Sequence, residues 1–314
     1  MDFRTTIKTD NLSEPIKHSD KLMLIGSCFT TNIGERLRDA LMAAMVNPLG
    51  TLYNPMSIAH AVERMVKCSL VQADELFYAN GVWNSFDFHS AFSSADKDVA
   101  LCRMNESITA AHEHLKECKY VIITLGTAIV YRHEGRVVGN CHKLPAAQFT
   151  RRMLTAREAE EALRQIVALL GEVSPKIQVI FTVSPIRHIA DGLAANSLSK
   201  ATLRVAISEL EMSNVLYFPS YEIMLDDLRD YRFYAPDMVH PSEVAVEYIW
   251  EQFRAACIDP GALSAIARCE RMTKWLRHRP MTDNAEALAR LNSDRRAAYA
   301  KLRADYPYLP ELTT

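Results

Sequence analysis

The stretch that decides the fold is KLMLIGSCFTTNIG at residues 21–34. An apolar run at 22–25 is followed by Gly26, then by Ser27 and Cys28, and then by the polar start of an amphipathic segment. This pattern predicts a buried strand, a sharp turn and a helix. A turn of this kind exposes a side chain above the sheet, and enzymes use it to present a nucleophile. Ser27 and Cys28 are the two candidates.

Composition limits the class of protein. The chain has 314 residues, of which 49% are hydrophobic and 24% are charged, and this suits one large α/β domain or two ordinary ones. A net charge of −2 gives no reason to expect nucleic acid or an anionic membrane as a partner. The first twenty residues are too charged for a signal peptide, so a soluble, cytoplasmic protein is expected.

Two further features agree with a cytoplasmic protein. The uncharged stretch 40–62 contains turn-forming residues, among them Asn47-Pro48 and Asn54-Pro55, which exclude a membrane span. The seven cysteines are scattered and form no C-x-x-C pair, which predicts reduced thiols and neither a disulfide framework nor a zinc site.

Short apolar runs alternate with helical patterns along most of the chain. The runs predict buried strands, and the spacing of apolar residues predicts a helix after the opening turn, a helix that Gly171 ends and a third helix further on. Alternation of this kind implies an α/β fold with a mostly parallel, five-stranded sheet covered by helices on both faces. The predicted strands are 22–25, 44–47, 120–125, 177–183 and 215–218, and the second and third helices are 155–171 and 199–212.

The pattern changes in two places. Residues 65–118 fit the alternation poorly and are interpreted as an insertion, which either builds a binding site or caps the fold without touching a ligand. After a main domain at 1–257, residues 258–314 read as a C-terminal helical extension, with Pro280 separating two helices at 261–279 and 283–305. The basic cluster in this extension is interpreted as a solvated helix face.

Reactive side chains follow the predicted strands, where ligands bind in parallel sheets. Thr127 follows a middle strand, and Arg187 and His188 follow the next. Asp237 and His240 lie in a late loop, before a helix whose predicted first residue is Pro241. An isolated Asp-x-x-His is better explained as a cap before a helix. Here a Gly-Ser turn after the first strand accompanies it, and a serine, a histidine and an aspartate can act as nucleophile, base and orienter.

Other residues give weaker signals. His89, His142, Arg187 and Lys200 are interpreted either as pocket-lining residues or as hydrogen-bonded structural residues. The sequence has neither a P-loop nor a dinucleotide fingerprint, and the histidines at 112 and 114 do not share a helix face. No cofactor and no metal are therefore predicted.

Several separate blocks resemble the GSCFA family, over roughly residues 1–255. The signature is GSCFT here, with Thr30 at the position where the family's name has alanine. The blocks that carry the resemblance are GSCFT (26–30), NPLGTLYNP (47–55), TLGTAIVY (124–131), NCHKLP (140–145), FTVSPIRH (181–188), LSKATL (198–203) and YRFYAPDMVHPSE (231–243).

That family is similar to the SGNH, or GDSL-like, hydrolases, which have a three-layer α/β/α fold with flavodoxin-like strand order. The resemblance implies Ser27 as nucleophile, His240 as general base and Asp237 as its orienter. It also assigns to Gly50 a backbone N–H that binds the oxyanion. Cys28 would then pack under the first helix as a small hydrophobic residue, because only one of two adjacent side chains is expected to face the site.

One block departs from the SGNH pattern. These enzymes usually have Gly-x-Asn-Asp where this chain has Gly126-Thr127-Ala128-Ile129, so the asparagine that donates to the oxyanion is missing. Thr127 and Asn54 are the candidate replacements, beside the backbone N–H groups of Ser27 and Gly50.

The resemblance thus favours a serine esterase or acyl hydrolase that acts on a small-molecule or carbohydrate ester, an acetyl ester of a sugar or glycan being one candidate. An acyltransferase and a non-catalytic binding protein on the same scaffold stay open as alternatives. The acyl chain and the oligomeric state are not predicted.

Overall fold

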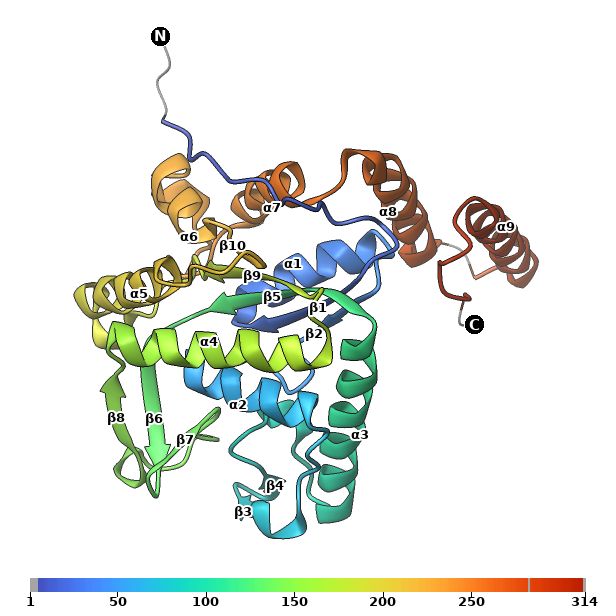
Figure 1. The fold of residues 1–314 in the computed structure, drawn as a ribbon. Coiled ribbons are helices and arrows are strands. Elements are labelled where there is room, and N and C mark those ends of the chain that lie inside the picture. The colour runs from blue at the N-terminus through green and yellow to red at the C-terminus, as the bar shows by residue number, and fades with distance from the viewer. Residues whose placement is uncertain (1–4, 282, 313–314) are drawn as a thin grey trace.

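The centre of the molecule is a five-stranded parallel sheet in the order β10-β9-β5-β1-β2 (Figure 1). The computed structural model describes residues 5–281 and 283–312. All five predicted strands are present, and their order along the sheet is flavodoxin-like, so the predicted fold class is confirmed. The strands are β1 (Lys21–Gly26), β2 (Ala44–Val46), β5 (Cys118–Leu125), β9 (Gln178–Val183) and β10 (Val215–Tyr217).

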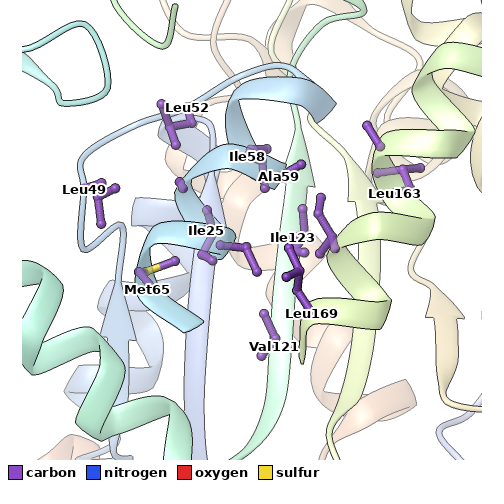
Figure 2. Packing of buried hydrophobic residues seen from close by; sticks show 14 of the residues in the cluster. Ile25, Leu49, Leu52, Ile58, Ala59, Met65, Val121, Ile123, Leu163 and Leu169 are labelled. Carbon is purple, nitrogen blue, oxygen red and sulfur yellow. The ribbon is translucent and has the colours of Figure 1, made fainter. Parts of the chain in front are cut away.

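Helices cover both faces of this sheet, which gives three layers. On β1, Leu22 and Leu24 belong to the cluster that holds the buried residues of α1 and α7, whereas Met23 and Ile25 belong to the cluster that holds those of α2, α3, α4 and α5. Figure 2 shows Ile25 among residues of α2, β5 and α4. Alternate residues of a strand point to opposite faces, so a continuous apolar run is needed when both faces are buried. The helices are α1 (Cys28–Asp39), α2 (Pro55–Val66), α3 (Lys97–Lys116), α4 (Ala156–Val173), α5 (Leu193–Ser208) and α7 (Glu243–Cys257).

Three helices differ from their predicted ranges. Helix α4 runs through Gly171 to Val173, because an exposed glycine weakens a helix without ending it. Helix α5 covers 193–208 instead of 199–212, and it begins directly after Gly192, whose φ is +83°. Helix α7 begins at Glu243 and not at Pro241, since the Ser242 side chain accepts the N–H of Ala245 as the N-cap.

The segment 65–118 is only partly separate from the layers. A small hairpin, β3 (Phe77–Ala79) and β4 (Val82–Asn84), lies outside the central sheet. Helix α3, however, buries one face in the same core as the sheet, through Met104, Ile108, Ala111 and Leu115. The part that departs from the strand–helix alternation is therefore shorter than the sequence suggests.

A second antiparallel unit follows β5 and was not predicted. Its strands, in the order β7-β6-β8, are β6 (Ile129–His133), β7 (Arg136–Val138) and β8 (Thr150–Met153). Thr150, Arg151 and Arg152 of β8 are exposed and polar, so no apolar run marks this strand in the sequence. Short helical turns complete the connections, namely α6 (Ser220–Glu222), a π-helical turn (Ile223–Asp227) and the 3₁₀ turns Ala73–Glu75, Ser90–Phe92, Ala146–Gln148, Ile189–Asp191, Tyr231–Phe233 and Pro260–Ala262.

The C-terminal extension consists of α8 (Leu263–Arg277) and α9 (Ala285–Asp305), which agrees with the predicted pair of helices around Pro280. Helix α8 packs Ile266 into the α1–α7 side of the core, and Cys269 packs against Leu302 of α9. Within the described residues, no helix combines the length and the apolar character that crossing a membrane requires.

Candidate active site

The turn after β1 depends on Gly26. Its φ is +145°, and a Cβ at this position would lie 2.2 Å from the carbonyl oxygen of Thr124 on the neighbouring strand β5. Only glycine lets the two backbones come so close. Ser27 follows as the N-cap of α1, and its backbone N–H donates to Thr124 O at 3.2 Å.

The Ser27 side chain is almost fully buried, with 1% of the residue exposed. Its Oγ accepts the backbone N–H of Phe29 at 3.3 Å, which is the usual capping bond at a helix N-terminus. A hydroxyl that accepts one bond still has its own hydrogen to donate. Ser27 can therefore donate a proton to a base while the helix holds its oxygen in place.

Asp237 and His240 form a hydrogen-bonded pair in the loop before α7. The distance from His240 Nδ1 to Asp237 Oδ2 is 2.6 Å, and Asp237 Oδ1 accepts the backbone N–H groups of His240 and Val239 at 2.9 Å each. These bonds, the His240 N–H first, lower the pKa of Asp237 to about 2. The carboxylate is thus ionised, and it occupies Nδ1 of the imidazole, which leaves Nε2 for other partners.

Ser27 and His240 line the same cavity, which has a volume of about 490 Å³. Ser27 stands at the carboxyl end of β1, and other lining residues follow β5 and β9, so the cavity lies where parallel sheets bind ligands. Among the described residues, no hydrogen bond joins Ser27 Oγ to His240. The lining is Ser27, Cys28, Thr51, Tyr53, Asn54, His89, Thr127, Ile129, Tyr131, Val138, Gly139, Asn140, Cys141, Ile186, Arg187, His188, Val239 and His240.

The prediction that only one residue of the Ser27–Cys28 pair faces the site is wrong. Cys28 lines the same cavity, and its Sγ lies 3.5 Å from the hydroxyl of Tyr53. The reason is the cap: the Ser27 side chain turns back onto the Phe29 N–H, while Cys28 begins the helix beside it. Burial, and next the bond with Cys28, raise the pKa of Tyr53 to about 12.

The predicted oxyanion role of Gly50 does not agree with its geometry. Its N–H donates to Asn47 O at 2.8 Å, and Gly50 does not line the cavity. A glycine is required for another reason, because φ is +89° and a Cβ there would lie 2.1 Å from Cβ of His89. The glycine lets His89, which does line the cavity, pack against the loop between β2 and α2.

Thr127 lines the cavity but uses its hydroxyl locally. Its Oγ1 accepts the N–H of Ile129 at 3.0 Å and lies 3.0 Å from Oγ of Ser199, which itself accepts the N–H of Ala128. Either hydroxyl of this pair can be the donor, and in both cases the Thr127 hydroxyl is engaged with Ser199 and the backbone.

Asn54 caps helix α2 and also lines the cavity. Its Oδ1 accepts the N–H of Ser57 at 2.9 Å, and its Nδ2 donates to Ser57 Oγ at 2.9 Å. One of the two amide hydrogens is used in this way. The other has no acceptor within the described part of the chain, so Asn54 combines a cap with a free donor at the cavity.

The four predicted pocket residues divide into two pairs. His89 and Arg187 line the cavity. His142 does not, and its Nε2 bonds to Ser85 O at 2.8 Å beside the β3–β4 hairpin. Lys200 is also outside the lining: it is 1% exposed, and its ammonium donates to the carbonyls of Gly126 and Ser184 at 2.7 and 2.8 Å. Burial lowers the pKa of Lys200 to about 7.

His188 is the cavity residue that sequence analysis placed after a strand without giving it a role. Its Nε2 is buried and has no hydrogen-bond partner among the described residues, and its ring meets Tyr53 edge-on at 5.9 Å between centroids. Burial, followed by the positive charge of Lys200, lowers its pKa to about 4. His188 is thus a neutral imidazole at pH 7, and no feature of its sequence neighbourhood distinguishes it from a structural histidine.

No three histidine, cysteine, aspartate or glutamate side chains lie close enough to hold a metal ion within residues 5–281 and 283–312. The groups at this cavity that can do chemistry include the Ser27 hydroxyl, the thiols of Cys28 and Cys141, and the imidazoles of His89, His188 and His240.

Comparison with known proteins gives two similar solved structures. One is a carbohydrate esterase of family 3 from Talaromyces cellulolyticus, with a TM-score of 0.38, 10% identity, and coverage of 79% of this chain and 98% of that one. The other is an acetyl xylan esterase from the rumen bacterium Butyrivibrio proteoclasticus, with a TM-score of 0.37, 13% identity, and coverage of 77% and 65%. Values this low carry no argument about the activity of this chain.

A comparison with curated proteins returned no match. The model of the GSCFA family, in contrast, matches residues 21–253, which span the central sheet, Ser27, and the Asp237–His240 pair. The chain therefore belongs to the GSCFA family.

Proposed function

We propose that this protein is a serine esterase or acyl hydrolase of the SGNH type, with Ser27 as nucleophile, His240 as general base and Asp237 as the residue that orients it. One observation carries the proposal. A capped serine hydroxyl at the carboxyl end of β1 opens onto the same cavity as an imidazole whose other nitrogen is held by an ionised carboxylate.

In the first half of the reaction, Nε2 of His240 takes the proton of Ser27 Oγ as the oxygen attacks the ester carbonyl carbon. Asp237 keeps the hydrogen of the imidazole on Nδ1 and stabilises the imidazolium that forms. The tetrahedral intermediate collapses, and the alcohol leaves with the proton from His240. In the second half, water repeats these steps on the acyl-serine and releases the acid.

The oxyanion needs hydrogen-bond donors that do not already have acceptors. The N–H of Cys28 is the first of helix α1, where the helix provides no acceptor, and it follows the nucleophile directly. The second amide hydrogen of Asn54 is the other donor at the cavity. We assign the oxyanion to these two groups in place of the predicted backbone N–H groups of Ser27 and Gly50, which donate to the carbonyl oxygens of Thr124 and Asn47.

A screen of p-nitrophenyl esters from acetyl to octanoyl, with an acetylated sugar as a further substrate, tests this function. The native protein should release p-nitrophenol, and Ser27→Ala should lower kcat by about 10⁴-fold or more. Ser208→Ala, which changes an exposed serine at the end of α5, is the matched control and should keep full activity.

Turnover that persists in Ser27→Ala would exclude the serine mechanism. A complete lack of turnover would favour a binding protein on the same scaffold. Faster loss of ester in the presence of an added alcohol, with the acyl group found on that alcohol, would identify a transferase.

A further inference from the structure

The active-site cavity has an unbalanced charge. Its lining includes Arg187 and three histidines, but no aspartate and no glutamate. Arg187 forms no ion pair with a carboxylate among the described residues, whereas Arg151, for example, pairs with Asp191. A guanidinium that lines a cavity and has no counter-ion is a binding group for an anion.

The position of Arg187 is fixed by its surroundings. Its guanidinium lies over the ring of Tyr234, 4.0 Å from the centroid, and 5.2 Å from the centroid of Tyr231. Its backbone N–H donates to Val239 O at 3.2 Å, next to His240. Stacking covers a face of the guanidinium, and a side-chain hydrogen bond joins Arg187 to Tyr234. The N–H groups of the guanidinium edge that this bond does not use can bind a planar anion.

The ionisable groups around the cavity have partners other than Arg187. Lys200 is buried without a carboxylate partner, since its ammonium bonds only to the carbonyls of Gly126 and Ser184. The nearby carboxylates have partners of their own: Asp191 is paired with Arg151, and Asp237 is bonded to His240. The positive charge of Arg187 is therefore not neutralised within the site.

We propose that the substrate is an ester that carries a carboxylate, and that Arg187 binds this group while Ser27 attacks the ester carbonyl. The inference rests on the proposed esterase function and adds the substrate class. It makes Arg187 a specificity-determining residue, whose contribution depends on the charge of the substrate.

Matched pairs of esters test this proposal. With the carboxylate on the alcohol side, the pair is 4-acetoxybenzoate and methyl 4-acetoxybenzoate. With the carboxylate on the acyl side, it is mono-4-nitrophenyl adipate and methyl 4-nitrophenyl adipate. Each pair differs mainly in one negative charge. For at least one pair, the native protein should have a kcat/KM about 10 to 100 times higher for the charged ester, the range expected of a charge-assisted hydrogen bond.

Two substitutions assign the preference to Arg187. Arg187→Met should remove it, through KM of the charged ester more than through kcat, and Arg187→Lys should keep part of it because the charge remains but the two-pronged donor is lost. Arg204→Met is the matched control. Arg204 also stacks on a tyrosine, Tyr217 at 3.7 Å, but is paired with Glu222 and does not line the cavity, so this variant should keep the native preference.

The outcomes separate this proposal from the proposed function. If neutral esters are cleaved in a Ser27-dependent reaction but neither pair shows a preference for charge, the carboxylate proposal is wrong and the esterase stands. If Arg187→Met lowers kcat/KM for charged and neutral esters equally, Arg187 has only a structural role. If no ester of either kind is cleaved, the esterase function and the substrate class fail together.

Discussion

Asp237 performs two tasks with one carboxylate: Oδ1 accepts the backbone N–H groups that shape its loop, and Oδ2 bonds to Nδ1 of His240. An asparagine at this position can still accept the backbone bonds through its oxygen. Its amide, however, would face Nδ1 as a donor and force the imidazole hydrogen onto Nε2, where it blocks proton transfer from Ser27. The identity of one atom therefore decides whether the pair can work as a base.

Asp237→Asn should for this reason lower kcat by several orders of magnitude, about 10⁴-fold, while the midpoint of thermal unfolding changes little. Steady-state kinetics and circular dichroism melting measure the two effects. Asp259→Asn is the matched control, because Asp259 likewise accepts a backbone N–H, that of Gly261, away from the cavity. Near-normal rates in Asp237→Asn would show that another group orients His240.

The two roles of Asn54 can be separated by substitution. Asn54→Ser keeps an N-cap for α2 but lacks the amide, whereas Asn54→Ala loses both, at a cost of about 1 kcal/mol in stability. If the amide binds the oxyanion, both variants should lose about 10² to 10³ in kcat with little change in KM. Thr127→Val should lose much less, because the Thr127 hydroxyl is bonded to Ser199. Full activity in Asn54→Ser would leave Asn54 as a cap only.

Single residues also show what the sequence could predict of the site. The sequence predicts Ser27, Asp237 and His240 as site residues, because they lie next to predicted strands and helices and match the family resemblance. The hydrogen bond between Asp237 and His240 agrees with that prediction. Gly50 was assigned wrongly, because a sequence does not show which acceptor a backbone N–H has. His188 was left without a role for a related reason: its lack of a partner is a property of the packed structure.

At the scale of elements, the site is built by the segments after β1, β2, β5 and β9 and by the loop before α7, and the β2–α2 loop is tightly packed. Gly50 in this loop has φ +89° and no room for a Cβ beside His89. Gly135, in the turn between β6 and β7, has nearly the same φ, +83°, but open space around it. The two glycines thus form a matched pair that differs in packing.

Gly135→Ala should cost about 1 kcal/mol in the free energy of unfolding, the penalty for an alanine at positive φ. Gly50→Ala should cost roughly 2 kcal/mol more, because the new methyl group must displace His89. Gly50→Ala should also lower kcat/KM, since His89 lines the cavity. Urea unfolding curves and ester hydrolysis give both quantities. Equal stability losses for the two variants would contradict the close packing of Gly50 against His89.

The elements that could be predicted well from the sequence are those that a continuous apolar run marks. Each central strand is an apolar run, because both of its faces are buried. Strand β8 was missed because its exposed polar residues, such as Arg151, leave no apolar run. The end of α4 was misplaced because Gly171 was read as a stop, although the exposed glycine fits within the helix.

At the scale of the whole molecule, the burial of a cavity residue, His188, makes the stability of the protein depend on pH. The pKa of His188 is about 4 in the folded protein and ~6.5 for a free histidine, so between these values the unfolded chain binds more protons than the folded one. Its contribution to stability is therefore complete above about pH 6.5 and is lost as pH falls toward 4. His18, His114 and His142, whose pKa values are also lowered by burial, act in the same direction.

Between pH 6.5 and pH 4, the free energy of unfolding should therefore fall by about 2 kcal/mol less in His188→Gln than in the native protein. His278→Gln, which changes an exposed histidine after α8, is the control and should leave the native pH dependence. The free energy of unfolding in urea at several pH values in this range measures the difference. Parallel pH profiles for the native protein and His188→Gln would show that His188 does not titrate as its burial requires.

The central claim is that Ser27, activated by His240, is the nucleophile of this fold. Labelling with a fluorophosphonate, followed by mass spectrometry of the peptides, tests it most directly, because the probe reacts with activated serines. The account predicts a single adduct on Ser27, which disappears in Ser27→Ala and His240→Ala and persists in Cys28→Ser. An adduct on Cys28, or no adduct on the folded protein at any pH between 6 and 9, would contradict the account.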